Sequence, residues 1–219
     1  MIDRSSYIEI LVSFVSRPLL KIFKKTSLSA NNITILGSIL GLSGGTIFFF
    51  EENFLFKFLS FILVYLYLVF DFIDGDLARY KNQASDKGYF LDIFFDKLIF
   101  IILIVTVLVK IDFGIPELEP LFILMSFLPM YFQLNLIIFT NLKKKGVNIV
   151  NWGDNISSEN IKQKLIIIYR RLFFPTHINT IFLLSLGLLL DMEIYAFCFV
   201  TITALIGILR QFYIIVKKL

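Results

Sequence analysis

The sequence predicts an all-α polytopic membrane protein, with six transmembrane helices and an N-terminal interfacial amphipathic helix. The first observation is composition: the 219 residues are 58% hydrophobic and 17% charged, with a mean hydropathy of +0.83. A soluble domain is about half apolar and about a quarter charged. The other two observations are long apolar runs and the placement of most charges between them. We therefore expect one membrane domain over 1–219, with an interfacial segment, 1–28, and a six-helix bundle, 29–219.

The first element is expected to be an amphipathic helix. Charges interrupt its apolar residues throughout, which argues against a signal peptide. The apolar residues that recur at helical spacing are Ile8, Leu11, Val12, Val15, Leu19 and Ile22. The residues on the opposite side are Ser5, Glu9, Ser13, Ser16 and Lys24. Such a helix lies in the membrane interface with its apolar face in lipid. Pro18 is expected to kink it or to begin a second turn.

Six mainly apolar windows of roughly membrane-spanning length follow: residues 32–50, 54–76, 88–110, 117–140, 176–191 and 193–216. The first window carries Gly37, Gly41 and Gly45 at four-residue intervals, plus Gly44. This smooth face lets a neighbouring helix pack closely, and that neighbour belongs either to the same chain or to a second subunit. We expect a homodimer. The polar stretch 142–175 is expected to be a loop with a short amphipathic helix at its end.

Alternating charge between the windows sets the expected orientation. Basic residues gather at both termini, between the second and third windows, and between the fourth and fifth. The other connections hold mostly acidic residues, with only Lys57 and Lys110 against them. Because basic loops stay in the cytoplasm, we expect an integral protein of the cytoplasmic (inner) membrane with both termini cytoplasmic. The net charge of +4 reflects this topology in the lipid bilayer, and no nucleic-acid partner is expected.

Four aspartates lie within the apolar windows, where carboxylates are costly and usually functional. Asp71 and Asp74 are three residues apart, and Asp92 and Asp96 are four apart. On helices each pair shares one face, so two helices could aim four carboxylates into one space on the cytoplasmic side. Four such charges repel unless protons or divalent cations lie among them. Oxygen ligands of this kind suit Mg²⁺, Mn²⁺ or Ca²⁺.

The residues between these aspartates suit a nucleotide diphosphate. Gly75 and Ala78 leave room for a ligand beside the helix, and Gly88 opens similar space. Arg79 offers a planar, permanently charged group that binds phosphate through two hydrogen bonds. Phosphoryl transfer needs metal ions to neutralise phosphate oxygens and a base for the attacking hydroxyl. Four carboxylates fit two metal ions better than one.

The full pattern D-x2-D-G-x2-A-R-x8-G-x3-D-x3-D, residues 71–96, resembles the signature of the class I CDP-alcohol phosphotransferases (CDP-alcohol phosphatidyltransferases). These are membrane enzymes of phospholipid head-group synthesis. Upstream, residues 29–34 resemble the family's PN-x-x-T element. Ala30 stands where proline is usual, and this departure is expected to loosen the turn. The resemblance covers residues 29–96, about a third of the chain.

The resemblance implies transfer of a phosphoalcohol group, expected to be phosphatidyl, from a CDP-alcohol such as CDP-diacylglycerol to an acceptor alcohol, with release of CMP. It implies two divalent ions, Mg²⁺ or Mn²⁺. The implied metal ligands are Asp71, Asp74, Asp92 and Asp96, of which Asp96 is also the implied catalytic base. The residues expected to bind the CDP moiety are Asn31, Thr34, Asp74, Gly75, Ala78, Arg79 and Gly88.

The acceptor alcohol stays open. The loop after the fourth window lacks the Gly-Lys-x-Lys-Thr-like element of glycerophosphate-using relatives, which disfavours that acceptor. Serine, inositol or its phosphate, choline, ethanolamine and sugar alcohols remain. Candidate acceptor contacts are Arg210, Arg171 and His177, with Arg210 favoured because a charge well inside a span needs a partner. An alternative donor is a CDP-polyol, used on a phosphorylated polyol or a lipid.

Other kinds of membrane protein also place acids inside spans. A cation transporter would not need Gly75, Ala78 and Arg79 beside its carboxylates, and the chain has no second half that repeats the first. A polyprenyl transferase uses metals and pyrophosphate, but its two acidic motifs lie in separated halves of a longer chain. Purely structural ion pairs with Lys97 or Arg210 are a further alternative. Release of CMP, of pyrophosphate or of neither distinguishes the two enzymes and the transporter.

Overall fold

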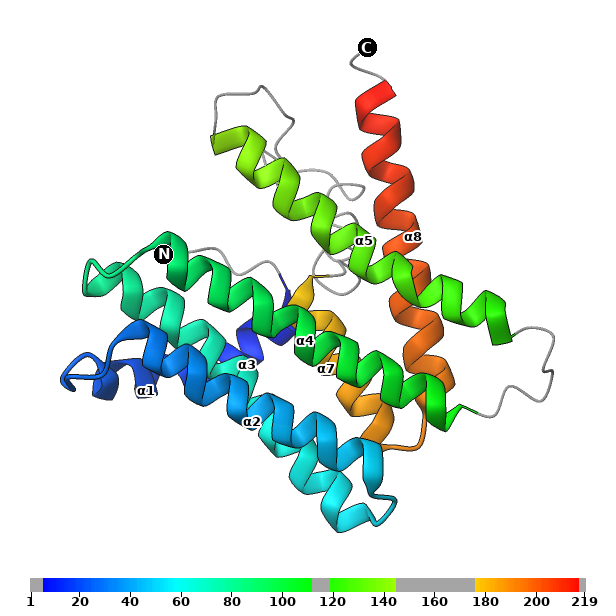
Figure 1. Ribbon diagram of the computed structural model, residues 1–219, viewed down its shortest axis with the longest axis horizontal. Helices are drawn as coiled ribbons and strands as arrows, with labels where there is room; N and C mark the ends of the chain where they lie inside the picture. Colours follow the sequence, from blue (N-terminus) through cyan, green and yellow to red (C-terminus); the bar gives the residue numbers. More distant parts are fainter. Residues whose placement is uncertain (1–5, 112–118, 145–175, 217–219) are drawn as a thin grey trace, which may run out of the picture.

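The computed structural model describes residues 6–111, 119–144 and 176–216, with side chains outside that description at 132–144 and 210–216. Every regular element in these segments is an α-helix, as the sequence predicts (Figure 1). The helices are α1 (Tyr7–Phe23), α2 (Ala30–Phe50), α3 (Phe54–Tyr80), α4 (Asp86–Lys110), α5 (Glu119–Lys144), α7 (His177–Leu189) and α8 (Glu193–Val216). The short helix expected near 170–174 lies outside the described residues.

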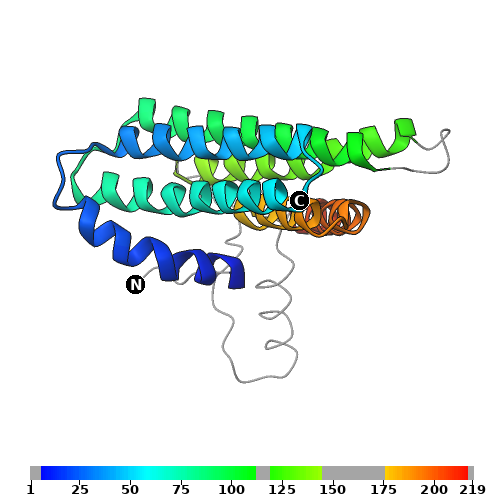
Figure 2. The same cartoon turned by 90° about the horizontal axis from the view of Figure 1, so that it is seen from below.

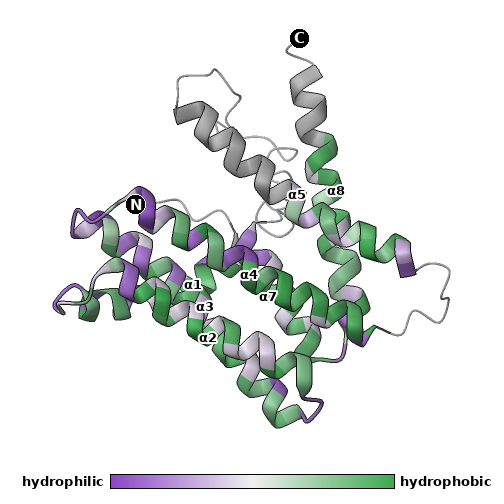
Figure 3. Cartoon of the chain, in the orientation of Figure 1, coloured by the Kyte–Doolittle hydropathy of each residue, from purple (hydrophilic) through white to green (hydrophobic). Residues whose placement is uncertain are grey.

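The helices from α2 to α8 coincide with the six apolar windows. Figure 3 shows that α2 and α3 are apolar over most of their length. By length and composition, α2 and α3 are able to cross a membrane among the residues described. The apolar length of α4 is interrupted by Asp92, Asp96 and Lys97, and α7 has only 13 residues. Among the described residues, two helices are thus both apolar and long enough to cross a membrane, and six crossings stay a prediction.

The glycine face of α2 packs against α3 and α4 of the same chain. A Cβ added at Gly41 would lie 2.6 Å from Ile99 Cδ1 and 2.9 Å from Tyr67 Cγ. One added at Gly44 would lie 2.8 Å from the carbonyl oxygen of Ser60. Larger residues at these positions would push the helices apart. The close partner of this face is thus within the chain, and a homodimer would have to use another surface.

The helix α1 lies along one side of the bundle, next to α3 and α7 (Figure 2). Two of the serines expected on its water-facing side, Ser13 and Ser16, are instead buried, with 3% and 4% exposed surface. Phe14 on another face is 74% exposed. Small serines allow α1 to approach its neighbours closely, and the Ser13 hydroxyl donates to the Ile10 carbonyl (2.7 Å). Pro18 lies inside the helix without ending it.

At the far end of α3 from the aspartates, four charged residues form a cluster that we call the loop-end ion pairs. Lys57 on α3 is almost fully buried and pairs with Glu52 (3.0 Å) and with Asp191. Lys110, at the end of α4, pairs with Glu52 as well. These are the two lysines that oppose the charge bias of the sequence. Each is neutralised by acidic residues of the neighbouring connections.

Candidate active site

The structure brings the four predicted aspartates together from two helices. Asp71 and Asp74 come from α3, and Asp92 and Asp96 come from α4. One carboxylate oxygen from each of Asp71, Asp74 and Asp92 lies within 4.8 Å of the others. All four carboxylates line a small cavity of about 10 Å³ beside Gly37 and Ser38 of α2. A space of this size accommodates about one water-sized particle.

The state of Asp74 fits a cation in this cavity. Its side chain is 6% exposed, and Oδ2 has no hydrogen-bond partner within the described part of the chain. A buried polar atom without a partner is costly and needs an explanation. A divalent cation held by oxygen ligands supplies one. The residues present therefore fit a metal ion of the Mg²⁺ or Mn²⁺ type.

A second group of possible ligands contains the one histidine of the chain. Atoms of Asp71, Asp96 and His177 lie within 4.8 Å of one another, so Asp71 belongs to both groups. His177 Nε2 is 3.1 Å from Asp96 Oδ1 and 3.2 Å from the Tyr67 hydroxyl. That hydroxyl also donates a hydrogen bond to Asp96 Oδ1. The structure thus places His177, a predicted acceptor contact, directly against the predicted base.

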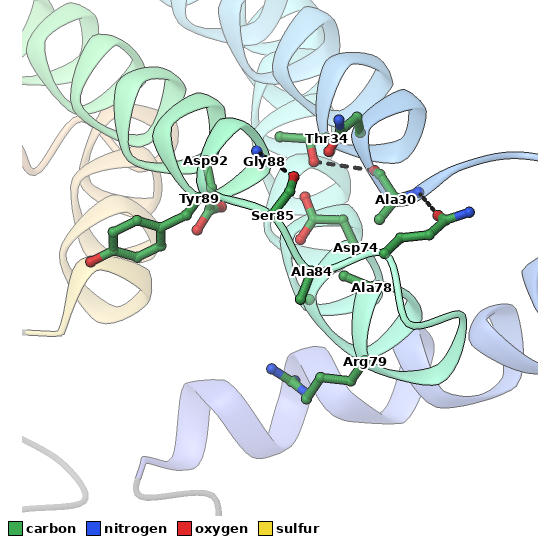
Figure 4. A pocket seen from close by; sticks show the side chains of 13 residues that line it. Ala30, Thr34, Asp74, Ala78, Arg79, Ala84, Ser85, Gly88, Tyr89 and Asp92 are labelled. Atoms are coloured by element: carbon green, nitrogen blue, oxygen red, sulfur yellow. Dashed lines mark hydrogen bonds between the residues drawn. The ribbon is translucent and has the colours of Figure 1, made fainter. Parts of the chain in front are cut away.

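A larger cavity of about 210 Å³ opens beside the carboxylates (Figure 4). It lies between the start of α2, the end of α3 and the start of α4. Its lining includes all seven residues predicted to bind CDP: Asn31, Thr34, Asp74, Gly75, Ala78, Arg79 and Gly88. Asp92 also lines it, and together with Thr34 and Asp74 it borders the small cavity too. The predicted metal and nucleotide residues therefore form one continuous region.

Local structure explains how the cavity stays open. Ser85 is the N-cap of α4 and accepts a hydrogen bond from the Gly88 backbone (3.1 Å). A Cβ at Gly88 would lie 2.9 Å from Asn31 Oδ1, so glycine lets the starts of α2 and α4 approach each other. A Cβ at Gly75 would meet only the Arg79 guanidinium, at 3.7 Å. Gly75 therefore leaves space open beside α3, as expected for a residue that makes room for a ligand.

Arg79 lines the cavity and pairs with Asp76, its neighbour on α3. The Arg79 side chain is 62% exposed, and its Nη2 atom is 2.6 Å from Asp76 Oδ1, three residues earlier on α3. Residues at this spacing face the same side of a helix. Asp76 thus holds the guanidinium at the cavity, which gives this otherwise unassigned carboxylate a structural role.

The turn between α3 and α4 also anchors the segment that leads into α2. The Ala30 backbone N–H donates to Gln83 Oε1 (3.1 Å). Lys81 Nζ donates to the carbonyls of Thr26 (2.8 Å) and Leu28 (2.7 Å). Proline has no N–H, so the hydrogen bond to Gln83 needs a residue such as alanine at position 30. The departure from the family pattern adds a contact here, and the looser turn expected from it stays a prediction.

Sequence reasoning missed some residues of this region. Tyr67 lies four residues, one helical turn, before Asp71, and that spacing was available as a signal. Ser85, three residues before Gly88, has the pattern of an N-cap. Gln83 and Tyr89 line the cavity without a local sequence signal. Of the other predicted acceptor contacts, Arg171 lies outside the described residues, and Arg210 lies in α8 with its side chain outside them.

Comparisons with known proteins place the chain in a family. The profile of the CDP-alcohol phosphatidyltransferase family matches residues 27–209. An uncharacterized protein of Aquifex aeolicus (strain VF5) is 42% identical over 76 residues, which are 34% of this chain and 36% of that protein's length. A crystal structure of Mycobacterium tuberculosis phosphatidylinositol phosphate synthase (PgsA1) with CDP-DAG bound is 16% identical, with a TM-score of 0.47; the alignment covers 93% of this chain and 92% of that one. Since the family profile covers most of its length, this chain belongs to the CDP-alcohol phosphatidyltransferase family, a family of enzymes that transfer substituted phosphate groups.

Proposed function

We propose that this protein is an integral membrane enzyme that transfers a phosphatidyl group from CDP-diacylglycerol, or a related phosphoalcohol group from another CDP-alcohol, to an acceptor alcohol. CMP is the other product. One observation carries the proposal: four carboxylates from α3 and α4 converge beside a 210 Å³ cavity that is lined by all seven residues predicted to bind CDP. Family membership supports it. The placement of basic residues supports a site that opens toward the cytoplasm, where nucleotides are available.

Two groups of residues would hold divalent ions. Asp71, Asp74 and Asp92 form one group, and Asp71 with Asp96 contributes to the other. When bound there, Mg²⁺ or Mn²⁺ neutralises the oxygens of the diphosphate. Arg79 adds a permanent positive charge at the rim of the cavity, where the diphosphate of the donor would lie.

Asp96 is the general base in this proposal. Its carboxylate takes the proton of the acceptor hydroxyl while the acceptor oxygen bonds to the phosphorus distal to cytidine. The bond from that phosphorus to the bridging oxygen breaks, and the electron pair leaves with CMP. Tyr67 donates to Asp96 Oδ1. This hydrogen bond orients the carboxylate and leaves Oδ2 as the oxygen that takes the proton.

Release of CMP is the direct test. We expect full-length protein in detergent or nanodiscs to release CMP from CDP-diacylglycerol when given Mg²⁺ or Mn²⁺ and the right member of an alcohol panel. CDP-polyol donors belong in the same assay, because they represent the alternative donor. Release of pyrophosphate would indicate the polyprenyl transferase class. If no donor and no alcohol gave CMP, the proposed activity would be wrong.

Replacement of Asp96 tests its role as the base. Asp96→Asn should lower kcat by about 100-fold or more, the usual contribution of general base catalysis, because an amide cannot take the proton. Asp86→Asn, on the exposed first turn of the same helix, is the matched control and should leave kcat unchanged. A near-normal kcat for Asp96→Asn would rule out Asp96 as the base.

A further inference from the structure

The two groups of possible metal ligands differ in chemistry. Asp71, Asp74 and Asp92 offer oxygen atoms only, whereas the second group adds the imidazole nitrogen of His177 to Asp71 and Asp96. His177 Nε2 is the nitrogen that faces these carboxylates, 3.1 Å from Asp96 Oδ1. Asp74 belongs to the all-oxygen group and lines the small cavity together with Asp71 and Asp96. It is only 6% exposed, and its Oδ2 atom has no hydrogen-bond partner among the described residues. This buried atom is a sign, independent of the grouping of ligands, that a cation belongs in the cavity that the two groups share.

The fold holds His177 in place from several sides. It is the first residue of α7, directly after the N-cap Thr176, whose hydroxyl accepts from the Asn179 backbone (3.2 Å). Asn179 is buried and accepts a hydrogen bond from the hydroxyl of Ser6, the N-cap of α1 (2.8 Å). Farther along α7, Phe182 packs against Phe61 of α3 with a ring-centroid distance of 5.7 Å. The imidazole is therefore directed at the carboxylates by packing that involves α1 and α3.

The ligand chemistry of the second group predicts its metal. Imidazole nitrogen binds first-row transition ions well, whereas Mg²⁺ strongly prefers oxygen ligands and water. We propose that His177 is a metal ligand together with Asp71 and Asp96, and that this position takes a first-row transition ion such as Mn²⁺ or Co²⁺ in preference to Mg²⁺. The proposal rests on the proposed function, because it assumes that the aspartates hold metal ions.

The competing explanation is that His177 only hydrogen-bonds to Asp96 and orients it. In that case Nε2 would stay in contact with a carboxylate oxygen, and both metal positions would have oxygen ligands from the protein. The two explanations differ in whether the histidine nitrogen is bonded to the metal. This difference can be measured directly.

The sequence makes the measurement specific, because His177 is the one histidine in the chain. Full-length protein with a histidine-free purification tag is produced with natural or with imidazole-¹⁵N-labelled histidine and loaded with Mn²⁺. Pulsed electron paramagnetic resonance of the resting protein should show coupling to a directly bonded nitrogen, and the coupling should change with the isotope. His177→Gln should lose this signal while Mn²⁺ still binds to the all-oxygen group. Tyr67→Phe, which removes a neighbouring hydroxyl and no nitrogen, should retain it.

A second measurement follows the metal preference. In the wild type we compare the dissociation constants for Co²⁺ and Mg²⁺. In His177→Gln the preference for Co²⁺ over Mg²⁺ should fall by about tenfold or more, the size of effect seen when groups around a metal are changed. His177→Asp, which makes the group all-oxygen, should shift the preference toward Mg²⁺.

Three results would overturn the proposal: no Mn²⁺ binding to the wild type, no histidine nitrogen coupling at saturating Mn²⁺, or an unchanged metal preference in His177→Gln. The measurements use resting protein without a donor, so they are independent of turnover. Nitrogen coupling without CMP release would support the metal site and contradict the proposed function. CMP release without nitrogen coupling would support the proposed function and contradict the metal site at His177.

Discussion

At the scale of single residues, two glycines line the same cavity but face different surroundings. Gly75, in the interior of α3, has only the Arg79 guanidinium within reach of an added Cβ, at 3.7 Å. Gly88, in the first turn of α4, has Asn31 Oδ1 at 2.9 Å and Ser85 Oγ at 3.3 Å. A methyl group at Gly75 would therefore enter the cavity, whereas one at Gly88 would displace Asn31.

This contrast gives a paired prediction. Gly75→Ala should raise the free energy of unfolding by about 0.5–1 kcal/mol, since alanine loses less backbone entropy than glycine in a helix. The same change should raise the KM for the CDP donor, because its methyl group occupies donor space. Gly88→Ala should raise that KM without the gain in stability. Thermal unfolding and steady-state kinetics check both, and a destabilised Gly75→Ala would contradict the open space at this position.

At the scale of elements, the start of α2 is attached to the turn between α3 and α4 through Ala30 and Gln83. Gln83→Ala should lower the free energy of unfolding by about 0.5–1.5 kcal/mol, the usual net value of one hydrogen bond. In an Ala30→Pro background, Gln83→Ala should have almost no further effect, because proline has already removed the donor. Proline is tolerated at the first position of a helix, so the background variant should fold. Additive effects in this double-mutant cycle would show that the hydrogen bond does not form.

The loop-end ion pairs connect α3, α4 and the turn after α7. The double variant Glu52→Gln and Asp191→Asn leaves the buried Lys57 without a charged partner from this cluster and should cost about 1–3 kcal/mol of unfolding free energy, the penalty for a buried group whose hydrogen bonds are lost. Adding Lys57→Met should recover most of that loss, because the buried charge is gone. Asparagine is chosen at position 191 because its backbone has a positive φ of 54°, which asparagine tolerates. A double variant as stable as the wild type would mean that Lys57 reaches water.

The same cluster predicts a dependence on pH. Hydrogen bonds from Lys110 and then from Lys57 lower the pKa of Glu52 below its ordinary value. A carboxylate with a lowered folded-state pKa stabilises the fold above its unfolded pKa and loses that contribution as the pH falls through the folded value. The loss is therefore expected below about pH 4.3, the ordinary glutamate pKa. Glu52→Gln should remove this part of the acid sensitivity in a pH series of unfolding measurements.

At the scale of the whole molecule, charge placement predicts that the site faces the cytoplasm. The single cysteine, Cys198, makes this easy to check in a Cys198→Ser background. A cysteine at Lys87, beside the cavity, should react with a membrane-impermeant thiol reagent only after the cells are opened. Glu51 follows the end of α2 that lies away from the cavity. A cysteine at this position should react in intact cells. The reverse pattern of labelling would place the site on the outer side of the membrane.

Local spacing was enough to identify the aspartates and their helices. Residues three or four apart share a helix face whatever that face packs against, so Asp71 with Asp74 and Asp92 with Asp96 could be paired before any packing was known. Long apolar windows located the helices from α2 to α8, because a run of about 20 apolar residues is long enough to span the membrane as a helix. The faces of α1 were harder to assign. Ser13 and Ser16 are buried because their small side chains let α1 pack closely against its neighbours. A pattern of polar and apolar residues does not report side-chain size.

Contacts between distant parts of the chain needed the folded bundle. Tyr67 and His177 are 110 residues apart, and no local pattern relates α7 to α3. The hydrogen bond of Ala30 to Gln83 likewise depends on two turns that meet only after the helices pack. The sequence thus located the acidic residues, since residues three or four apart share a face of a helix, and the motif that they form carried the resemblance that implied the reaction class. Tertiary packing decided that the one histidine lies against Asp96, since only the geometry between helices sets distances across the site.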